Sequence, residues 1–116
     1  MLLPLKHRSA LAKFCCGVAP IRLETGRYER LAVNNRICPL CNTEVENEIH
    51  VLLNCPQYND IRQTLFDKAK DINNGFPMLS DVNKLNVLLS NCDIVREVAK
   101  SCHLILEQRV KSLYYN

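Results

Sequence analysis

Three cysteines and one histidine near the middle of the sequence have the types and the spacing of a metal site. They follow the pattern Cys-x2-Cys-x8-His-x4-Cys and are Cys38, Cys41, His50 and Cys55. Thiolate and imidazole groups are ligands that Zn²⁺ favours, and four of them fill its tetrahedral coordination sphere. Such a site leaves no position for a water or a substrate, so its expected role is structural. The sequence therefore predicts one Zn²⁺ ion in a non-catalytic module.

Local sequence features explain how the four ligands can meet. Pro39, between the first two cysteines, favours a tight turn that directs both sulfur atoms toward one ion. On an unbroken α-helix, residues five positions apart, such as His50 and Cys55, point about 140° away from each other. Pro56 disfavours helical geometry at the residue before it, so a helix through His50 should stop by about Asn54. We therefore expect Cys55 to fold back toward the histidine.

Two other interpretations of the cysteines stay open. In the first, Cys15 or Cys16 takes the place of His50 in the ligand set. In the second, the cysteines are small buried side chains and the histidine lies at the surface without a metal. The chain has seven cysteines in total, so it uses this residue freely. The closed four-ligand spacing favours the metal site over both alternatives.

The remaining histidines are expected outside the metal site. His103, beside Cys102 on the last predicted helix, is a possible ligand, but we expect it at the edge of a packed face. His7 lies in a basic stretch and is expected to be solvated. No Ser-His-Asp group, phosphate-binding glycine loop or pair of catalytic carboxylates stands out. We therefore expect neither enzymatic activity nor a small-molecule substrate.

Apolar periodicity predicts a mainly α-helical fold around this motif. Apolar residues recur every three or four positions in the second half of the chain, as on one face of a helix. Residues 21–36 have no clear period, so we expect an irregular arm with a short extended segment at Ile21, Leu23 and Thr25. The predicted helices cover residues 4–16, 43–54, 56–72, 80–90 and 94–113.

Residues that commonly begin or end helices predict where these helices stop and start. Gly17 suits the residue just past the first helix, and Ser80 suits the cap of the fourth. Thr43 with Glu46 three residues later is typical of a capping box that starts the helix through His50. We distinguish three segments that should form one compact unit. These are a basic helix and arm (1–36), a zinc motif (37–58) and a helical segment (59–116).

Charge is distributed unevenly along the chain. Residues 1–36 carry seven Lys and Arg side chains against two Glu, whereas residues 37–116 have a net charge of −2. A nucleic-acid backbone could dock on the basic segment, although scattered charges of this kind also occur on ordinary solvated faces. No stretch approaches the roughly 20 apolar residues of a membrane span, and no secretory signal is evident. We therefore expect an intracellular protein, in the nucleus or the cytoplasm, with no membrane partner.

Three stretches of the sequence carry a resemblance to a known family. They are RLETGRY at Arg22 to Tyr28, RICPLC at Arg36 to Cys41, and VENEIHVLLNCPQY at Val45 to Tyr58, followed by Arg62. In this order they resemble the zinc-binding region near the C-terminus of reverse transcriptases encoded by non-LTR retrotransposons. The resemblance covers about residues 10–66.

That resemblance implies the four ligands named above and a role in holding template RNA or target DNA. The polymerase itself is absent, because Tyr58-Asn59-Asp60-Ile61 lacks the second aspartate of the family's catalytic motif. The Glu-x-Lys or Asp-x-Lys signature of the nuclease in some relatives is absent as well. The chain therefore looks like a detached fragment, either domesticated or a non-functional remnant of a retroelement.

Nucleic acid is expected to contact the basic arm and not the spacer between the ligands. The spacer carries Glu44, Glu46 and Glu48, whose carboxylates should repel phosphate. Tyr28 could stack on an unpaired base or pack within the fold. An alternative function is a protein-interaction module that uses the amphipathic helix at residues 94–113. The candidate nucleic-acid-binding residues, here called the basic arm, are Arg22, Arg27, Tyr28, Arg30 and Arg36.

Overall fold

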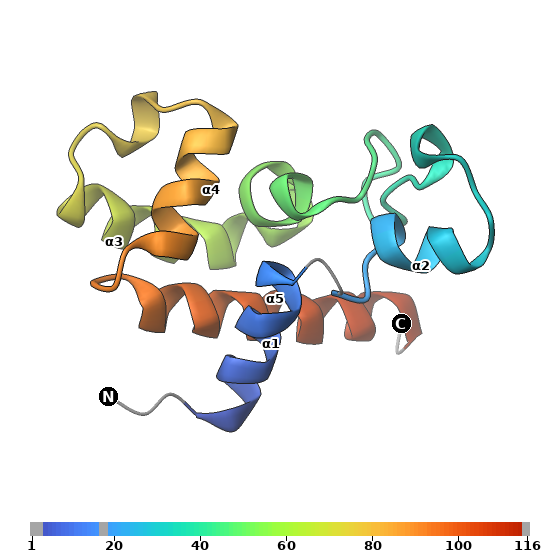
Figure 1. Ribbon diagram of the computed structural model, residues 1–116, viewed down its shortest axis with the longest axis horizontal. Coiled ribbons are helices and arrows are strands. Elements are labelled where there is room, and N and C mark those ends of the chain that lie inside the picture. Colours follow the sequence, from blue (N-terminus) through green and yellow to red (C-terminus); the bar gives the residue numbers. More distant parts are fainter. Residues whose placement is uncertain (1–3, 17–18, 115–116) are drawn as a thin grey trace.

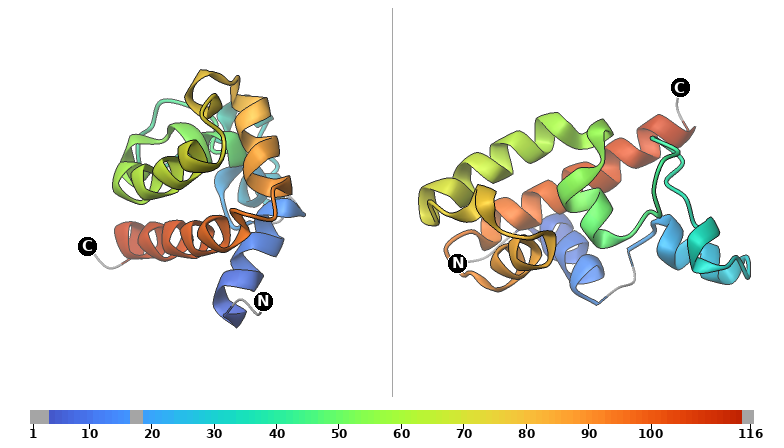
Figure 2. Two further views of the ribbon diagram at one scale, coloured as in Figure 1. Left: turned by 90° about the vertical axis from the view of Figure 1, so that its left-hand side faces the viewer. Right: turned by 90° about the horizontal axis from the view of Figure 1, so that it is seen from above.

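Helix α5 (Val95–Tyr114) is the longest element, and the other helices are arranged around it (Figure 1). The structure is a computed structural model that describes residues 4–16 and 19–114. Helix α1 (Leu5–Cys15) crosses α5 at a steep angle, and α3 (Asn59–Ile72) lies beside α5 and runs in the opposite direction (Figures 1 and 2). The segment with the cysteines lies over the C-terminal half of α5 (Figure 1).

The remaining elements are short and helical. Helix α4 (Asp81–Ser90) packs against α5 at the end distant from the cysteines. In the described part of the chain, extended pairing is limited to one isolated antiparallel bridge between Ile37 and Val45. The expected mainly α-helical class is therefore confirmed. The other short elements are α2 (Arg22–Tyr28), 3₁₀ turns at Val33–Asn35, Pro56–Tyr58 and Phe76–Met78, and a π-helical turn at His50–Asn54.

One apolar core joins the helices to the segment that carries the cysteines. Side chains from all three sequence segments contribute to it, and two of the cysteines, Cys38 and Cys55, are themselves part of it. The metal motif is therefore packed into the domain and is not an appendage. Large buried members of this core include Phe14, Ile21, Leu52, Leu65, Phe76, Leu88, Val98 and Ile105.

The helix ends only partly follow the expected capping residues. The Ser80 hydroxyl accepts a hydrogen bond from the backbone N–H of Asn83 at 3.3 Å, as predicted. Gly17, expected after the first helix, lies outside the described residues. The capping box at Thr43 and Glu46 is wrong, because the backbone at residues 44–46 pairs with residues 36–38. The helical turn starts at residue 48, and the Asn47 side chain caps it.

The arm between residues 21 and 36 is more regular than expected. In place of an extended segment it contains α2, whose first N–H group, that of Arg22, donates to Glu46 Oε1 at 2.6 Å. A helix of seven residues is too short to be stable by its own propensity. The carboxylate that caps it comes from a distant part of the sequence, so the local pattern could not reveal it.

The apolar side of α5 is covered within the chain. Val98, Cys102 and Ile105 are buried where α5 packs against α1, α3 and α4. Most of the apolar stripe at residues 94–113 that we considered for a protein partner therefore belongs to the core of the fold. None of the helices in the described ranges combines the length and the apolar character that crossing a membrane would need.

Candidate metal centre

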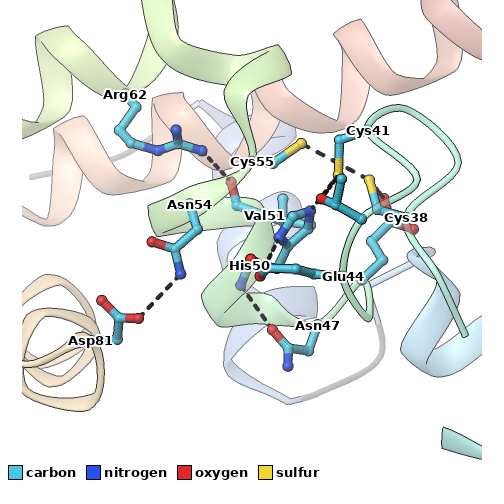
Figure 3. Close-up of polar contacts among 12 residues, drawn as sticks. Cys38, Cys41, Glu44, Asn47, His50, Val51, Asn54, Cys55, Arg62 and Asp81 are labelled. Carbon is cyan, nitrogen blue, oxygen red and sulfur yellow. Dashed lines mark hydrogen bonds and ion pairs between the residues drawn. The ribbon is translucent and has the colours of Figure 1, made fainter. Parts of the chain in front are cut away.

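A short hairpin-like turn positions the first two cysteines. The backbone N–H of Cys38 donates to the carbonyl of Glu44 at 2.9 Å, and the N–H of Asn42 donates back to the carbonyl of Cys38 at 2.9 Å. Asn42 has a φ of 59°, in the left-handed region that asparagine tolerates better than most residues. This geometry turns the chain sharply after Pro39 and brings the Cys38 and Cys41 side chains toward the same point (Figure 3).

A π-helical turn positions the other two residues. The N–H of Cys55 donates to the carbonyl of His50, five residues earlier, at 2.7 Å. This turn is wider than an α-helical turn, so residues five apart come onto nearly the same side. Cys55 itself is extended, with φ −63° and ψ 122°, as expected before Pro56. The sequence predicted a break that brings His50 and Cys55 together, and the wider turn was not foreseen.

The four side chains converge on one point (Figure 3). Their ligand atoms all lie within 4.8 Å of one another. The Cys38 and Cys55 sulfur atoms are 3.9 Å apart, and Cys41 Sγ is 3.3 Å from His50 Nε2. Around a tetrahedral ion with bonds of about 2.3 Å to sulfur and 2.0 Å to nitrogen, ligand atoms are separated by roughly 3.5 to 3.8 Å. The cluster therefore has the donor set and the spacing to hold one metal ion, and we call it the ligand cluster.

A carboxylate next to the ligand cluster orients its histidine. His50 Nδ1 lies 3.2 Å from Glu44 Oε2, on the side of the ring opposite to the sulfur atoms. A hydrogen bond from Nδ1–H to this carboxylate leaves the Nε2 lone pair for a metal. The backbone N–H of His50 donates to Asn47 Oδ1 at 2.8 Å, which fixes the start of the helical turn. A proton on Nδ1 would give the imidazole the tautomer that a metal site requires.

The three thiols have different acidities in the absence of a metal. Burial raises the pKa of Cys38 to about 12, and it also raises the pKa of Cys55. Burial acts in the same direction on Cys41, but hydrogen bonds from Thr43, Cys38 and His50 outweigh it and lower the pKa of Cys41 to about 6. Cys41 is therefore the thiolate available at neutral pH. Binding of a cation would release protons from the other two.

Glu46 lies deep in the fold, next to the ligand cluster. Its carboxylate accepts two hydrogen bonds from Arg109, at 2.9 and 2.8 Å, and it lies 3.7 Å from the Cys38 sulfur. It also caps α2 through the N–H of Arg22. Glu46 was expected, with Glu44 and Glu48, to repel phosphate, but this side chain is fully buried and paired with Arg109, so its charge is not presented at the surface. One carboxylate joins the ligand cluster, α2 and α5.

Arg62 supports the π-helical turn from the side of α3. Its guanidinium donates to the backbone carbonyl of Val51 at 3.1 Å (Figure 3). It also donates to the carbonyl of Leu52 at 3.1 Å. A carbonyl near the end of a helix lacks an intrahelical partner, and a buried one needs a donor from elsewhere. Arg62 supplies these donors. The nearby Tyr58 hydroxyl is buried without a hydrogen-bond partner among the described residues, and burial raises its pKa.

Cys15, Cys16 and His103, which the sequence offered as alternative ligands, lie outside the ligand cluster. Cys15 and Cys16 are exposed at the C-terminal end of α1 and are not part of the ligand cluster. His103 lies on α5, with Nε2 3.4 Å from Glu107 Oε2. Its ring packs against that of His7 at a centroid distance of 5.2 Å, so His7 is not simply solvated as expected. The structure therefore favours the ligand set that contains His50.

Two residues of the basic arm are engaged in the fold. Arg22 pairs with Glu29. The Arg36 guanidinium donates twice to the carbonyl of Leu31, at 3.1 and 2.9 Å. The Arg36 side chain lies so close to Gly26 that a Cβ atom there would come within 2.5 Å of it. Arg22 and Arg36 therefore hold α2 and the loop after it.

The other three residues of the basic arm are exposed. Arg27 lies over the ring of Tyr28, 5.3 Å from its centroid. Arg30 has a φ of 60° and follows the end of α2, where the N–H of Leu31 donates to the carbonyl of Gly26 at 3.0 Å. This is a Schellman-type helix end. The three side chains form a small basic surface, here called the α2 surface.

Arg109, the buried partner of Glu46, was not singled out from the sequence. It lies seven residues after Cys102 and four after Ile105, in register with the buried stripe of α5. A charged residue at such a position needs a buried partner of opposite charge. The stripe was therefore a usable signal for a buried arginine, but only the fold identifies Glu46 as its partner.

Known proteins add no guide to the role of this site. Comparison of the chain with protein-family models, with curated proteins and with solved structures finds no match.

Proposed function

We propose that the chain is a structural zinc module that binds nucleic acid weakly and without sequence preference. The observation that carries the metal part is the spacing of the four ligand atoms, all within 4.8 Å of one another. Three thiolates and one imidazole in a tetrahedral arrangement favour Zn²⁺ over ions that prefer oxygen ligands or square-planar geometry. Four protein ligands leave no open coordination position, which supports a structural, non-catalytic role.

Elemental analysis of the purified protein tests the metal. We expect about one zinc per chain, and we expect Cys55→Ser and His50→Ala to lose most of it. Matched controls are Cys92→Ser and His103→Ala, which change the same residue types outside the ligand cluster and should keep the zinc. A folded wild type that contains almost no metal would contradict the proposal.

The nucleic-acid part of the proposal is supported by charge and exposure. Net positive charge is concentrated before Cys38, and the α2 surface presents Arg27 and Arg30 to solvent beside the ring of Tyr28. Arginines of this kind contact phosphates, and an exposed aromatic ring can stack on an unpaired base. Neither contact reads sequence, so binding should be weak and general.

A salt titration tests the surface. The double variant Arg27→Gln, Arg30→Gly should bind any single-stranded oligonucleotide less tightly, and the slope of log affinity against log salt should flatten by up to about two. The control Arg96→Gln, Lys100→Gln removes two exposed charges from α5 and should change the slope less. Equal effects of the two double variants would show that the α2 surface has no special role, and no binding even at low salt would remove nucleic acid from the proposal.

We further propose that the chain derives from a retrotransposon reverse transcriptase. This origin rests on the sequence resemblance at residues 22–62 alone. Genomic context tests it, because an open reading frame for a polymerase directly upstream would support a retroelement fragment. An unrelated upstream region in every copy of the gene would count against it.

A further inference from the structure

A surface groove lies between α1, α2 and the C-terminal half of α5, and Pro39 of the segment that carries the ligand cluster borders it. It encloses about 1340 Å³ and is lined by residues from all three helices. Both α1 and α2 lie on the same side of α5 in the view from above (Figure 2). The groove follows α5 from His103 to Leu113, a length of about 15 Å at 1.5 Å per residue. That length matches about three turns of a second helix.

The walls of this groove expose large apolar side chains. Leu5 is 72% exposed, Tyr28 is 75% exposed and Val110 is 42% exposed, and all three line the groove. Leu106 and Leu113 add further apolar surface between them. Contiguous apolar surface in a groove is typical of a binding site and less typical of ordinary solvent-facing surface. An occupant that presents an apolar face would therefore be stabilised here.

The rim of the groove is positively charged. Lys6 and Lys13 on α1 have no ion-pair partner among the described residues, and Lys111 makes only a 3.5 Å contact with Glu107. The two carboxylates at the groove are already paired. Glu29 pairs with Arg22, and Glu107 pairs with His103 as well as Lys111. The charge left for an occupant is therefore basic, and it favours acidic groups on the occupant.

We infer that this groove binds an amphipathic helix of another protein, about three turns long, with an apolar face and acidic flanks. Leucine-like side chains at positions i, i+3 or i+4, and i+7 would cover Leu5, Leu106 and Val110, in the helix-in-groove mode. Glutamates or aspartates beside them would approach Lys6 and Lys13. Among the described residues that line the groove, Tyr28 and His103 carry rings, and the His103 ring already packs against that of His7, so the groove offers little stacking surface to a nucleic acid. This inference does not depend on the proposed zinc or nucleic-acid functions.

Designed peptides test the inference directly. The first probe is a labelled helical peptide of about 12 residues with leucines at the anchor positions and glutamates elsewhere. The matched probe has the same leucines and lysines in place of the glutamates. We expect the acidic peptide to bind at least about tenfold more tightly than the basic one, because like charges across an interface oppose binding. Equal binding of both peptides, or no binding of the acidic one, would overturn the inference.

Variants locate the bound peptide on the protein. Val110→Asp and Lys13→Glu should each weaken binding of the acidic peptide at least about fivefold, with unchanged melting temperature and metal content. The matched control is Met78→Asp, which changes an apolar side chain that is 89% exposed and lies outside the groove. Binding that depends on Met78 and not on Val110 would overturn the inference. So would displacement of the acidic peptide by an oligonucleotide whose own binding requires Val110, because the groove would then be a nucleic-acid site.

Discussion

The two halves of this molecule are held together in different ways. Residues 19–58 contain one α-helix of seven residues and a few single turns, connected by directed polar contacts and by the ligand cluster. Residues 59–114 contain three helices of 14, 10 and 20 residues, whose apolar stripes pack on one another. The first half adds a few specific polar contacts to its share of the apolar core, whereas the second distributes its stabilisation over many small apolar contacts.

The two halves should therefore differ in how much stability they lose when one contact is removed. A helix with a long apolar stripe tolerates the loss of one contact, because neighbouring side chains still bury surface. A turn held by one ligand or one carboxylate has no neighbouring contacts that replace the lost one, so one substitution should destabilise it more. Glu46 and Arg109 connect the two halves, since the carboxylate comes from residues 37–58 and the guanidinium comes from α5. The following predictions test the difference and that connection.

Removal of the metal should have the largest effect. Zinc in comparable small sites contributes on the order of 10 kcal/mol to folding. With a chelator present, amide hydrogen exchange should become fast at residues 37–55. It should also become fast in α2, because Glu46 caps that helix. Helices α3 and α4 should keep most of their protection, since their apolar stripes need no metal.

Hydrogen exchange followed by mass spectrometry measures this effect in each segment. The same experiment on Cys55→Ser without chelator serves as a control for chelator side effects. Loss of all helical protection together with the metal segment would show that both halves fold as one unit. The difference between them would then be one of geometry and not of stability.

Glu46 and Glu44 should respond differently to the same substitution. Glu46→Gln removes the buried carboxylate charge that pairs with Arg109, so the free energy of unfolding should fall by about 3 kcal/mol or more. The Glu44 side chain is exposed, and within the described residues its polar contact is to the His50 ring, so Glu44→Gln should leave stability nearly unchanged. It should instead weaken metal affinity by about 10- to 100-fold.

Denaturant unfolding and a competitive metal titration separate these two outcomes. The double variant Glu46→Gln, Arg109→Gln should be less destabilised than the sum of its single variants, because neither buried charge is then left alone. Equal stability loss in Glu46→Gln and Glu44→Gln would mean that the buried ion pair does not connect the two halves.

Alkaline pH should destabilise the helical half through Cys102. Burial raises the pKa of this thiol from its ordinary 9.0 to about 12. The unfolded chain loses this proton from about pH 9 while the folded chain keeps it, so the contribution of the thiol is complete below pH 9 and declines as the pH rises toward 12. The expected loss is at most about 1.4 kcal/mol per pH unit.

Unfolding curves at pH 8, 9 and 10, roughly spanning the onset of thiol ionisation, measure this decline. Cys102→Ala should make it shallower, whereas Cys92→Ala, which changes an exposed cysteine, should not. An unchanged slope in Cys102→Ala would assign the decline to other groups.

The smallest effect is expected at the end of α2. Arg30 has a φ of 60°, a conformation that costs a non-glycine residue roughly 1 kcal/mol. Arg30→Gly should therefore raise the free energy of unfolding slightly, by about 0.5 to 1 kcal/mol. The melting temperature of the metal-loaded protein measures this gain. A lower melting temperature would indicate that the Arg30 side chain itself stabilises the loop.

Much of the helical half could be predicted from the sequence. The stripes of α3 and α5 and the cap at Ser80 follow from local periodicity and from hydrogen bonding between near neighbours. The helix at residues 22–28 could not be predicted, because its first N–H group donates to Glu46, 24 residues away. The capping box at Thr43 failed for the same reason, since backbone pairing with residues 36–38 competes for that stretch.

For the ligand cluster, too, some features could be predicted from the sequence and others could not. Residue type and spacing picked out the four side chains that the fold brings together, because a metal site depends on a short, closed set of donors. Spacing did not reveal the π-helical turn that places Cys55 beside His50, nor the orientation of His50 by Glu44. Both depend on distances between atoms that no sequence pattern specifies.

Residue types and short spacings were enough to predict the four clustered side chains, the helical class and the uneven charge of this protein. These properties depend on residue type, on short spacings and on the period of a helix. Which charges are buried, which arginines hold the fold and where an apolar groove stays open became evident from the three-dimensional fold. Burial depends on contacts between segments far apart in the chain, as with Glu46 and Arg109, 63 residues apart. Two chemically similar residues, Glu44 and Glu46, therefore have different roles.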